Sequence, residues 1–254
     1  MAEQEPAGWL AKLGLTMAVP RVAVLGLARS GIGAARLCLH HGCRVDLLDL
    51  KAPEGSEEAL RELVERGALL RLGPHHHEWL SGIDLVVKSP GVPAGIALLA
   101  EARARGVAAI GECELASLAA RGPILAITGT NGKSTTTAWA GDILRLAGMK
   151  VQVVGNIGRA FSEGVLEAAD ATFVCEISSF QLEDTVTFRP AVACLLNLTT
   201  DHLDRHGNLE SYLEAKLRIF DRQRDGDVAL VGPDESLARA ARRRAGGRFA
   251  RFLN

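Results

Sequence analysis

The residues with the clearest chemical potential form the run TGTNGKST at positions 128–135. An apolar segment, 123–127, precedes this run as an expected buried strand, and an alanine- and leucine-rich segment, 134–147, follows it as an expected helix. In that context the backbone N–H groups and the amino end of the helix form a cradle for phosphate. Lys133 adds a positive charge, and the Ser134 hydroxyl suits Mg²⁺.

The sequence therefore predicts a loop that binds the phosphates of a nucleotide. The match to the usual G-x-x-x-x-G-K-S pattern is imperfect, because Ile127 stands where the first glycine is expected. A plain glycine turn before an ordinary helix is the alternative. The expected nucleotide-binding residues are Gly129, Thr130, Asn131, Gly132, Lys133, Ser134 and Thr135.

Three side chains farther along the chain suit the same chemistry. Glu176 follows an apolar run, and a buried carboxylate is costly unless it meets a cation such as Mg²⁺ or is satisfied by local N–H groups. His202 lies in a polar stretch, 197–207, where it is either a metal ligand or a solvated loop residue. Lys216 lies between apolar neighbours on an expected helix, 209–220, a pattern typical of a surface lysine.

A second glycine-rich turn lies near the amino terminus. The run GLARSG at 26–31 is a degenerate G-x-G-x-x-G with Ala28 in the second position, and Asp49 ends the next expected strand. Another turn, Ser89-Pro-Gly, follows the strand expected at 83–87. Three interpretations stay open at this point: a nicotinamide or flavin cofactor, the diphosphate of another nucleotide, or a structural turn.

The spacing of these turns predicts two α/β units in series, each built on a parallel sheet. We expect a Rossmann-like domain over residues 1–111 and a P-loop-type ATP-binding α/β domain, incomplete, over 112–254. The expected strands are 22–25, 44–48, 68–72, 83–87, 107–110, 123–127, 151–154, 171–177, 191–196, 227–231 and 248–253. The expected helices are 30–41, 57–66, 96–105, 112–120, 134–147, 209–220 and 236–245.

Composition excludes several classes of protein. The net charge of −1 and an aromatic content of 4% argue against a nucleic-acid partner. No apolar run approaches the roughly 20 residues that span a bilayer, so no membrane association is expected. The five cysteines include no C-x-x-C pair, which favours a reducing compartment. A cytoplasmic location is expected.

Taken together, these residues resemble the Mur ligases, the ATP-dependent amide-forming enzymes of bacterial cell-wall synthesis. The KST ending of the phosphate loop and the SSFQL run at 178–182 look like the members that add D-glutamate. The resemblance covers about nine-tenths of the chain. It is carried by GTNGKST at 129–135, GNIG at 155–158, EISSFQLE at 176–183, the stretch 197–205 and AKLRI at 215–219, with agreement from 26–31, Asp49, 89–91 and 111–112.

The resemblance implies a role for each catalytic position. Lys133 would hold the β- and γ-phosphates of ATP. Ser134 and Glu176 would bind one Mg²⁺ ion, and His202 a second. Lys216 matches the lysine that CO₂ carbamylates in this family, which turns a cation into a metal ligand and replaces the surface interpretation.

The resemblance also implies the substrates. Asn156 matches a residue near the reacting carboxyl group, and Ala28, Arg29, Asp49 and Ser89 match the pocket for UDP, so no hydride carrier is implied. The implied reaction joins D-glutamate to UDP-N-acetylmuramoyl-L-alanine at the expense of ATP, through an acyl phosphate, in peptidoglycan precursor synthesis. A monomer is expected.

The sequence stops inside an expected strand, 248–253, from which we expect a truncated central domain that turns over poorly or not at all by itself. Three alternatives remain at this stage. The first is a Mur-type ligase for another amino acid, and the second is a non-catalytic nucleotide-binding protein. The third, a nicotinamide dehydrogenase, would explain the first glycine turn but would leave the phosphate loop without a purpose.

Overall fold

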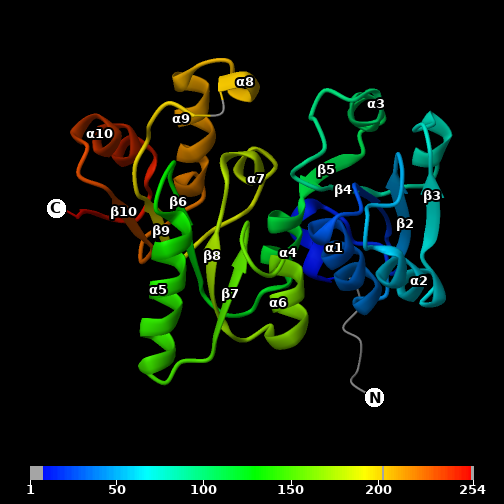
Figure 1. Ribbon diagram of the computed structural model, residues 1–254, viewed down its shortest axis with the longest axis horizontal. Coiled ribbons are helices and arrows are strands. Elements are labelled where there is room, and N and C mark those ends of the chain that lie inside the picture. Colours follow the sequence, from blue (N-terminus) through cyan, green and yellow to red (C-terminus); the bar gives the residue numbers. More distant parts are fainter. Residues whose placement is uncertain (1–7, 202, 253–254) are drawn as a thin grey trace. The chain divides into compact units, whose positions relative to one another are not determined.

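The computed structural model describes residues 8–201 and 203–252 (Figure 1). Two parallel sheets, each flanked by helices, confirm the predicted α/β class. The chain divides into two compact units. The first takes the residues up to Ala119 together with Phe161–Leu166, and the second takes Ala120–Ala160 and the residues from Glu167 onward. The domain boundary expected after residue 111 stays a prediction.

The first unit is a five-stranded sheet in which every neighbouring pair of strands is parallel. Its order is β3-β2-β1-β4-β5. The order reverses beside β1, and in open α/β sheets the crevice at such a point is where ligands bind. The strands are β1 (Arg21–Leu25), β2 (Arg44–Asp49), β3 (Leu69–Leu72), β4 (Leu85–Lys88) and β5 (Ala108–Gly111). The helices are η1 (Gly8–Leu13), α1 (Arg29–His40), α2 (Glu57–Glu65), η2 (His77–Leu80), α3 (Ala97–Ala104) and α4 (Glu112–Ala119).

Short continuous apolar runs form the central strands of this unit. All four residues of β4 are buried, as are the last four of β1. Strands that are covered on both faces need such runs instead of alternating polar and apolar residues. One face of the sheet packs Leu25 and Val86 against Leu98 and Leu99 of α3, with Trp79 at the margin. The burial holds the carboxyl ends of β1 and β4 side by side.

The second unit is a six-stranded sheet, also parallel throughout, in the order β11-β10-β9-β6-β8-β7. Its central strand β6 therefore lies between β8 and β9. The strands are β6 (Ile124–Thr128), β7 (Val151–Gly155), β8 (Thr172–Glu176), β9 (Val192–Leu195), β10 (Val228–Val231) and β11 (Arg248–Arg251). The helices are α5 (Lys133–Leu146), α6 (Phe161–Ala168), α7 (Ser179–Glu183), α8 (Leu203–His206), α9 (Leu209–Leu217), η3 (Arg218–Phe220) and α10 (Glu235–Arg244).

Helix α5 lies along β7 and β8, as Figure 1 shows. Ala140 and Leu144 pack against a cluster that includes Ile127. A Cβ atom on Gly141 would lie only 2.4 Å from Cγ2 of Val153, so glycine lets the helix approach the sheet closely. This close packing fixes the amino end of α5, where the phosphate loop ends.

Three helices of the second half, α6, α7 and α8, are absent from the sequence-based expectation. Helix α6 follows a bridge between Val154 and Arg159, and its first six residues belong to the first unit. Helix α7 has only five residues, and a capping box between Ser178 and Gln181 stabilises its amino end. The helix expected at 209–220 is interrupted, because its last three residues form the 3₁₀ turn η3. No helix among the described residues combines the length and apolarity that crossing a bilayer requires.

Candidate active site

The phosphate loop has the predicted strand–turn–helix form. Strand β6 ends at Thr128, and α5 begins at Lys133. Gly132 has φ +78°, a left-handed conformation that favours glycine. A Cβ atom on Gly129 would lie 3.0 Å from Cβ of Leu196, in the loop after β9. Both glycines are therefore required by the backbone path, and the helix points its free N–H groups at the turn.

Asn197, in the loop after β9, holds this turn through hydrogen bonds, a contact that the sequence did not predict. Its Oδ1 accepts hydrogen bonds from the backbone N–H groups of Thr130, at 3.1 Å, and Asn131, at 2.9 Å. Its Nδ2 donates to the carbonyl oxygen of Asn131 at 3.0 Å. Thr199 adds a further bond, from its N–H to Oγ1 of Thr130 at 3.0 Å. The loop after β9 thus fixes the shape of the phosphate loop.

The Lys133 ammonium group lies over the same turn and is half-buried. Its Nζ donates to the carbonyl oxygen of Thr130 at 2.8 Å. An ammonium group on a flexible stem can leave one carbonyl for a phosphate with little strain. Lys133 is the first residue of α5, and its ammonium group lies beside the backbone of the phosphate loop.

Glu176 ends β8 directly beside this turn. In the sheet, Glu176 pairs with Ile127 of β6 on one side and with Gly155 of β7 on the other. The residue is 1% exposed, and its two carboxylate oxygens accept hydrogen bonds of 2.8 Å from Ser134 Oγ and Asn156 Nδ2. The hydrogen-bonding needs of the Glu176 carboxylate are thus met by the side chains of Ser134 and Asn156. The sequence had offered local backbone N–H groups as an alternative. A hydroxyl and a carboxylate in contact are donors that suit Mg²⁺.

Lys216 is buried, so its interpretation as a surface residue, based on pattern alone, is wrong. The residue is 1% exposed, and Nζ donates to the carbonyl oxygen of Gly129 at 2.8 Å. It lies 4.4 Å from the ring centroid of Tyr212, one helical turn earlier on α9. Burial lowers the pKa of Lys216 to about 7, and repulsion from Lys133 contributes a smaller part of this shift. The attraction of Asp201 opposes it.

The remaining predicted metal ligand, His202, lies outside the described residues. Within residues 8–201 and 203–252, no three His, Cys, Asp or Glu side chains converge on a ready metal site. Ser134 and Glu176 place two protein oxygens in contact beside the loop, where a cation could bind. Phosphate oxygens would have to complete the ligand set.

The first unit brings its predicted residues to the ends of β1, β2 and β4. Asp49 Oδ2 accepts a hydrogen bond of 2.7 Å from the N–H of Leu27, and Ser89 Oγ donates to the carbonyl oxygen of Gly26 at 2.7 Å. Ala28 precedes the first turn of α1, and Arg29 begins that helix. All of them lie around the turn after β1, at the reversal of strand order. Gly26 has φ +87°, and a Cβ there would lie 2.7 Å from Val92.

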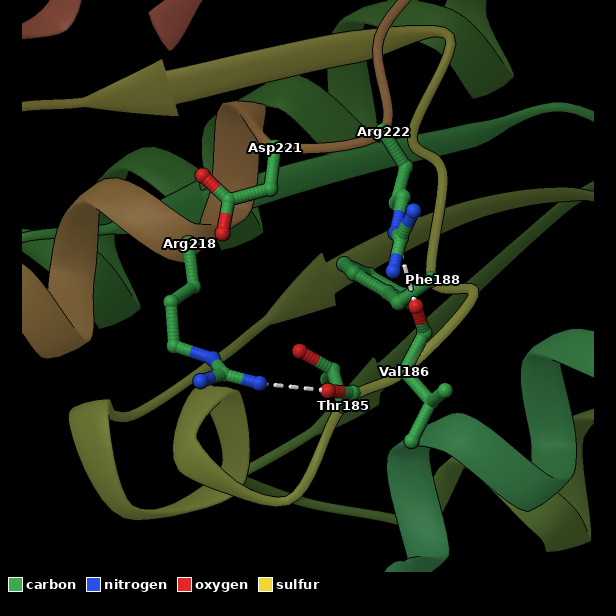
Figure 2. Close-up of a pocket in the computed structure, with 6 residues that line it drawn as sticks. All are labelled: Thr185, Val186, Phe188, Arg218, Asp221 and Arg222. Carbon is green, nitrogen blue, oxygen red and sulfur yellow. Dashed lines mark hydrogen bonds between the residues drawn. The ribbon is translucent and has the colours of Figure 1, made fainter.

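A pocket of about 160 Å³ lies elsewhere in the second unit (Figure 2). Arg218 donates to the carbonyl oxygen of Thr185 at 2.6 Å, and Arg222 donates to that of Val186 at 2.8 Å. These segments lead into the amino ends of β9 and β10, whereas the phosphate loop lies at the carboxyl ends of the strands. None of the predicted site residues lines this pocket. Its lining consists of Thr185, Val186, Phe188, Arg218, Asp221 and Arg222.

A parallel α/β unit with a loop of the phosphate-binding type, in one chain with a Rossmann-like unit, defines an α/β protein of two units. Residues 127–253 match the Mur ligase middle domain, and residues 20–111 match the MurD-like N-terminal domain of Mur ligases. The chain belongs to the Mur ligase family.

Curated relatives agree with this membership. The chain is 45% identical over 215 residues to the UDP-N-acetylmuramoylalanine--D-glutamate ligase of Koribacter versatilis, covering 84% of this chain and 48% of that protein. It is 46% identical over 217 residues to the protein of the same name from Alkaliphilus oremlandii, with 84% and 48% covered. The chain thus spans about half the length of the curated relatives it matches.

The UDP-N-acetylmuramate:L-alanyl-gamma-D-glutamyl-meso-diaminopimelate ligase of Neisseria meningitides shares the fold. It aligns with a TM-score of 0.65 at 17% identity, over 92% of this chain and 78% of that one.

Proposed function

We propose that this chain is part of an ATP-dependent carboxylate–amine ligase that adds D-glutamate to UDP-N-acetylmuramoyl-L-alanine. The names of the relatives support the choice of amino acid, since several D-glutamate ligases are 42–46% identical to this chain. One observation carries the proposal for the site. Ser134 bonds Glu176, and Lys216 bonds Gly129, so the acid and the buried lysine both meet the phosphate loop.

In this proposal the predicted ATP-binding domain, residues 112–254, binds ATP. Gly129, Gly132 and the backbone N–H groups at the start of α5 surround the phosphates. Lys133 exchanges its bond to Thr130 for one to the β- and γ-phosphates. The positive end of the α5 dipole adds to this attraction. The loop residues Thr130, Asn131, Ser134 and Thr135 complete the cradle.

The proposed divalent ion rests on Ser134 and Glu176, whose oxygens are in contact. Mg²⁺ bound there would neutralise charge on the phosphoryl group in transfer. Asn156 holds the other carboxylate oxygen of Glu176 and faces the substrate carboxyl group in this assignment. His202 is the proposed ligand of a second ion.

Lys216 is proposed to react with CO₂. A neutral amine attacks the carbon, a new N–C bond forms, and a proton is released, which leaves an anionic carbamate. The reaction needs the unprotonated amine, and the pKa of about 7 makes that form abundant near neutral pH. The carbamate would be an oxygen ligand in the place of a cation.

The predicted Rossmann-like domain, residues 1–111, is proposed to bind the UDP part of the substrate. Asp49 and Ser89 fix the turn after β1, and Ala28 and Arg29 begin the helix that follows it. A diphosphate beside that helix end would meet free N–H groups. This use of the degenerate glycine turn leaves no role for a nicotinamide.

The proposed reaction has two steps. The terminal carboxylate of the alanyl substrate attacks the γ-phosphorus, so an acyl–oxygen–phosphorus bond forms and the bond to ADP breaks. The amine of D-glutamate then attacks the acyl carbon, the amide bond forms, and inorganic phosphate leaves. A carboxylate alone is a poor electrophile, and phosphorylation supplies the leaving group. Positioning and charge neutralisation do most of the work.

The first test is calorimetric binding of Mg·ATP and of UDP-N-acetylmuramoyl-L-alanine to this chain. We expect Lys133→Ala to weaken Mg·ATP binding at least tenfold. Lys150→Ala is the matched control, because Lys150 is an exposed lysine paired with Asp170 and should leave the affinity unchanged. Equal affinities for all three proteins would contradict the proposed role of Lys133.

The second test is phosphate release by this chain fused to the carboxyl-terminal half of the Koribacter versatilis ligase. We expect release that depends on D-glutamate and on the UDP-linked substrate, and slow or no release from the 254-residue chain alone. Release that depends on another amino acid would contradict the D-glutamate assignment. Binding of NADH without binding of ATP would overturn the proposal as a whole.

A further inference from the structure

A buried histidine, outside the proposed catalytic set, joins α7 to α9. His206 is the last residue of α8, and its side chain is 2% exposed. Its Nε2 lies 3.0 Å from Ser179 Oγ, and its Nδ1 lies 3.2 Å from Glu183 Oε1. Ser179 and Glu183 are the first and last residues of α7, four positions apart and therefore on one face. Both ring nitrogens are thus held by one short helix.

The faces of the same imidazole contact aromatic rings from two helices. The ring of Phe180, on α7, stacks on it with centroids 5.2 Å apart and planes inclined by 13°. The ring of Tyr212, on α9, lies 4.9 Å away. Tyr212 is 1% exposed, so its position depends on these neighbours.

Tyr212 in turn contacts two parts of the proposed ligase site. Lys216 Nζ lies 4.4 Å from its ring centroid, within the range of a cation–π contact. A side-chain interaction with Thr130, in the phosphate loop, opposes the rise that burial causes in the pKa of the Tyr212 hydroxyl. A continuous chain of contacts therefore runs from α7 through His206 and Tyr212 to the loop and to the buried lysine.

We propose that His206 is a positioning residue that fixes Tyr212, and through Tyr212 fixes Lys216 and the phosphate loop. The inference rests on the proposed function of that site. The order Ser179–His206–Glu183 also resembles a hydrolytic triad, but Ser179 is 2% exposed. A nucleophile must meet its substrate, so the arrangement orients a ring and does not attack an ester or amide.

The test uses Tyr212 as a spectroscopic reporter, because it is the one tyrosine in the sequence. Chain labelled with 3-fluorotyrosine gives a single ¹⁹F resonance, recorded without nucleotide and during titration with Mg·AMP-PNP. We expect His206→Ala to shift and broaden the nucleotide-free resonance. We also expect about tenfold weaker nucleotide binding, because the stacking contacts, the hydrogen bond with Ser179 and the contact with Glu183 are lost.

Two substitutions at Glu183 separate positioning from general stability. Glu183→Gln keeps an oxygen that accepts from Nδ1 and should keep the wild-type resonance, with affinity within about twofold of wild type. Glu183→Leu removes that oxygen and should resemble His206→Ala. His41→Ala is the matched control, since that imidazole stacks on Trp9 at 4.6 Å in the first unit. It should leave the Tyr212 resonance unchanged.

Hydrogen exchange locates the effect. We expect His206→Ala to speed exchange in α9 and in the turn 129–132, and not in β1–β5. A folded His206→Ala protein with an unchanged resonance would overturn the proposal. If that variant does not fold, identical resonances for Glu183→Gln and Glu183→Leu would overturn it instead. Failure of the wild-type chain to bind nucleotide would count against the proposed function, whereas the nucleotide-free resonance still decides the role of His206.

Discussion

Lys216 shows how far its surroundings change a residue's chemistry. Burial and the nearby Lys133 lower its pKa from 10.5 to about 7. The folded protein therefore gives up this proton at a lower pH than the unfolded chain does. Between about pH 7 and 10.5 the unfolded chain binds more protons at this position, so the free energy of unfolding rises with pH in that window.

This shift gives the first prediction, a pH dependence of stability. The free energy of unfolding should rise by about 1.4 kcal/mol per pH unit between pH 7.5 and 9.5, relative to Lys216→Met, which has no titrating group there. Urea unfolding without bicarbonate at several pH values measures both proteins. Parallel curves for the two proteins would show that the lysine has an ordinary pKa.

Asn197 gives the second prediction. Asn197→Ala removes three hydrogen bonds that shape the phosphate loop. The loop would then have to be ordered when the phosphates bind, so we expect Mg·ATP affinity to fall about fivefold to tenfold. Calorimetry measures this change. Asp234→Ala is a useful control, because it removes a helix cap as well, that of α10, and Asp234 makes no contact with the loop in the proposal. An unchanged affinity for Asn197→Ala would contradict the proposed role of Asn197 in shaping the phosphate loop.

Residue type and local order predicted Lys133, Ser134 and Glu176, because their chemistry depends on the strand or helix that carries them. Asn197 and His206 could not be found in this way. Asn197 acts on residues 66 and 67 positions away, and His206 bonds a serine 27 positions away. Such contacts depend on strand order, which a single sequence does not specify.

At the scale of elements, the third prediction concerns the packing of α5. Gly141→Ala should raise the helix propensity of α5 by about 1 kcal/mol, yet its new Cβ would lie 2.4 Å from Val153. We expect a net loss of about 1–3 kcal/mol from overpacking, since β-branched valine has little rotamer freedom. Thermal unfolding measures the loss. Adding Val153→Ala should restore part of it, and equal losses in both backgrounds would show that the contact is not the cause.

The strands and long helices followed from apolar runs and periodicity, whereas α6 and α7 did not. Helix α7 has five residues, too few for a periodic signal, and it depends on the Ser178–Gln181 capping box. Most of helix α6 belongs to the first unit, because Phe161–Leu166 join that unit although the residues before and after them in the sequence belong to the second. A pattern read along the chain assigns a segment to its neighbours in sequence, and tertiary contacts can assign it elsewhere.

At the scale of the whole molecule, both sheets were predictable as parallel, and their strand orders were not. The position of α6 also affects how the chain can be divided. Glu112, at the start of α4, is 1% exposed and accepts bonds of 2.6 Å from the N–H and the hydroxyl of Ser162. Phe161 and Val165 of the same helix are buried. A cut after Ala119 would therefore remove part of the first unit's core.

A fourth prediction follows from this arrangement. We expect the fragments 1–119 and 120–254 to be less stable than the intact chain and to bind a hydrophobic dye. The first fragment loses the packing of α6, and the second exposes the apolar face of that helix. Circular dichroism melts and dye fluorescence measure both effects. A fragment 1–119 that melts as cooperatively as the first unit of the intact chain, at the same temperature, would contradict the assignment of α6.

Ser162→Ala tests the same contact in the intact chain. Burial raises the pKa of Glu112, and the bonds from Ser162 oppose that rise. The folded state therefore binds the proton more tightly than the unfolded chain, so stability falls as pH rises above about 4.5. Without the serine hydroxyl this fall should extend to higher pH, and the neutral-pH loss should be about 1–3 kcal/mol. Glu112→Gln should remove the pH dependence in both backgrounds, because an amide carries no titrating proton and can still accept from the Ser162 N–H.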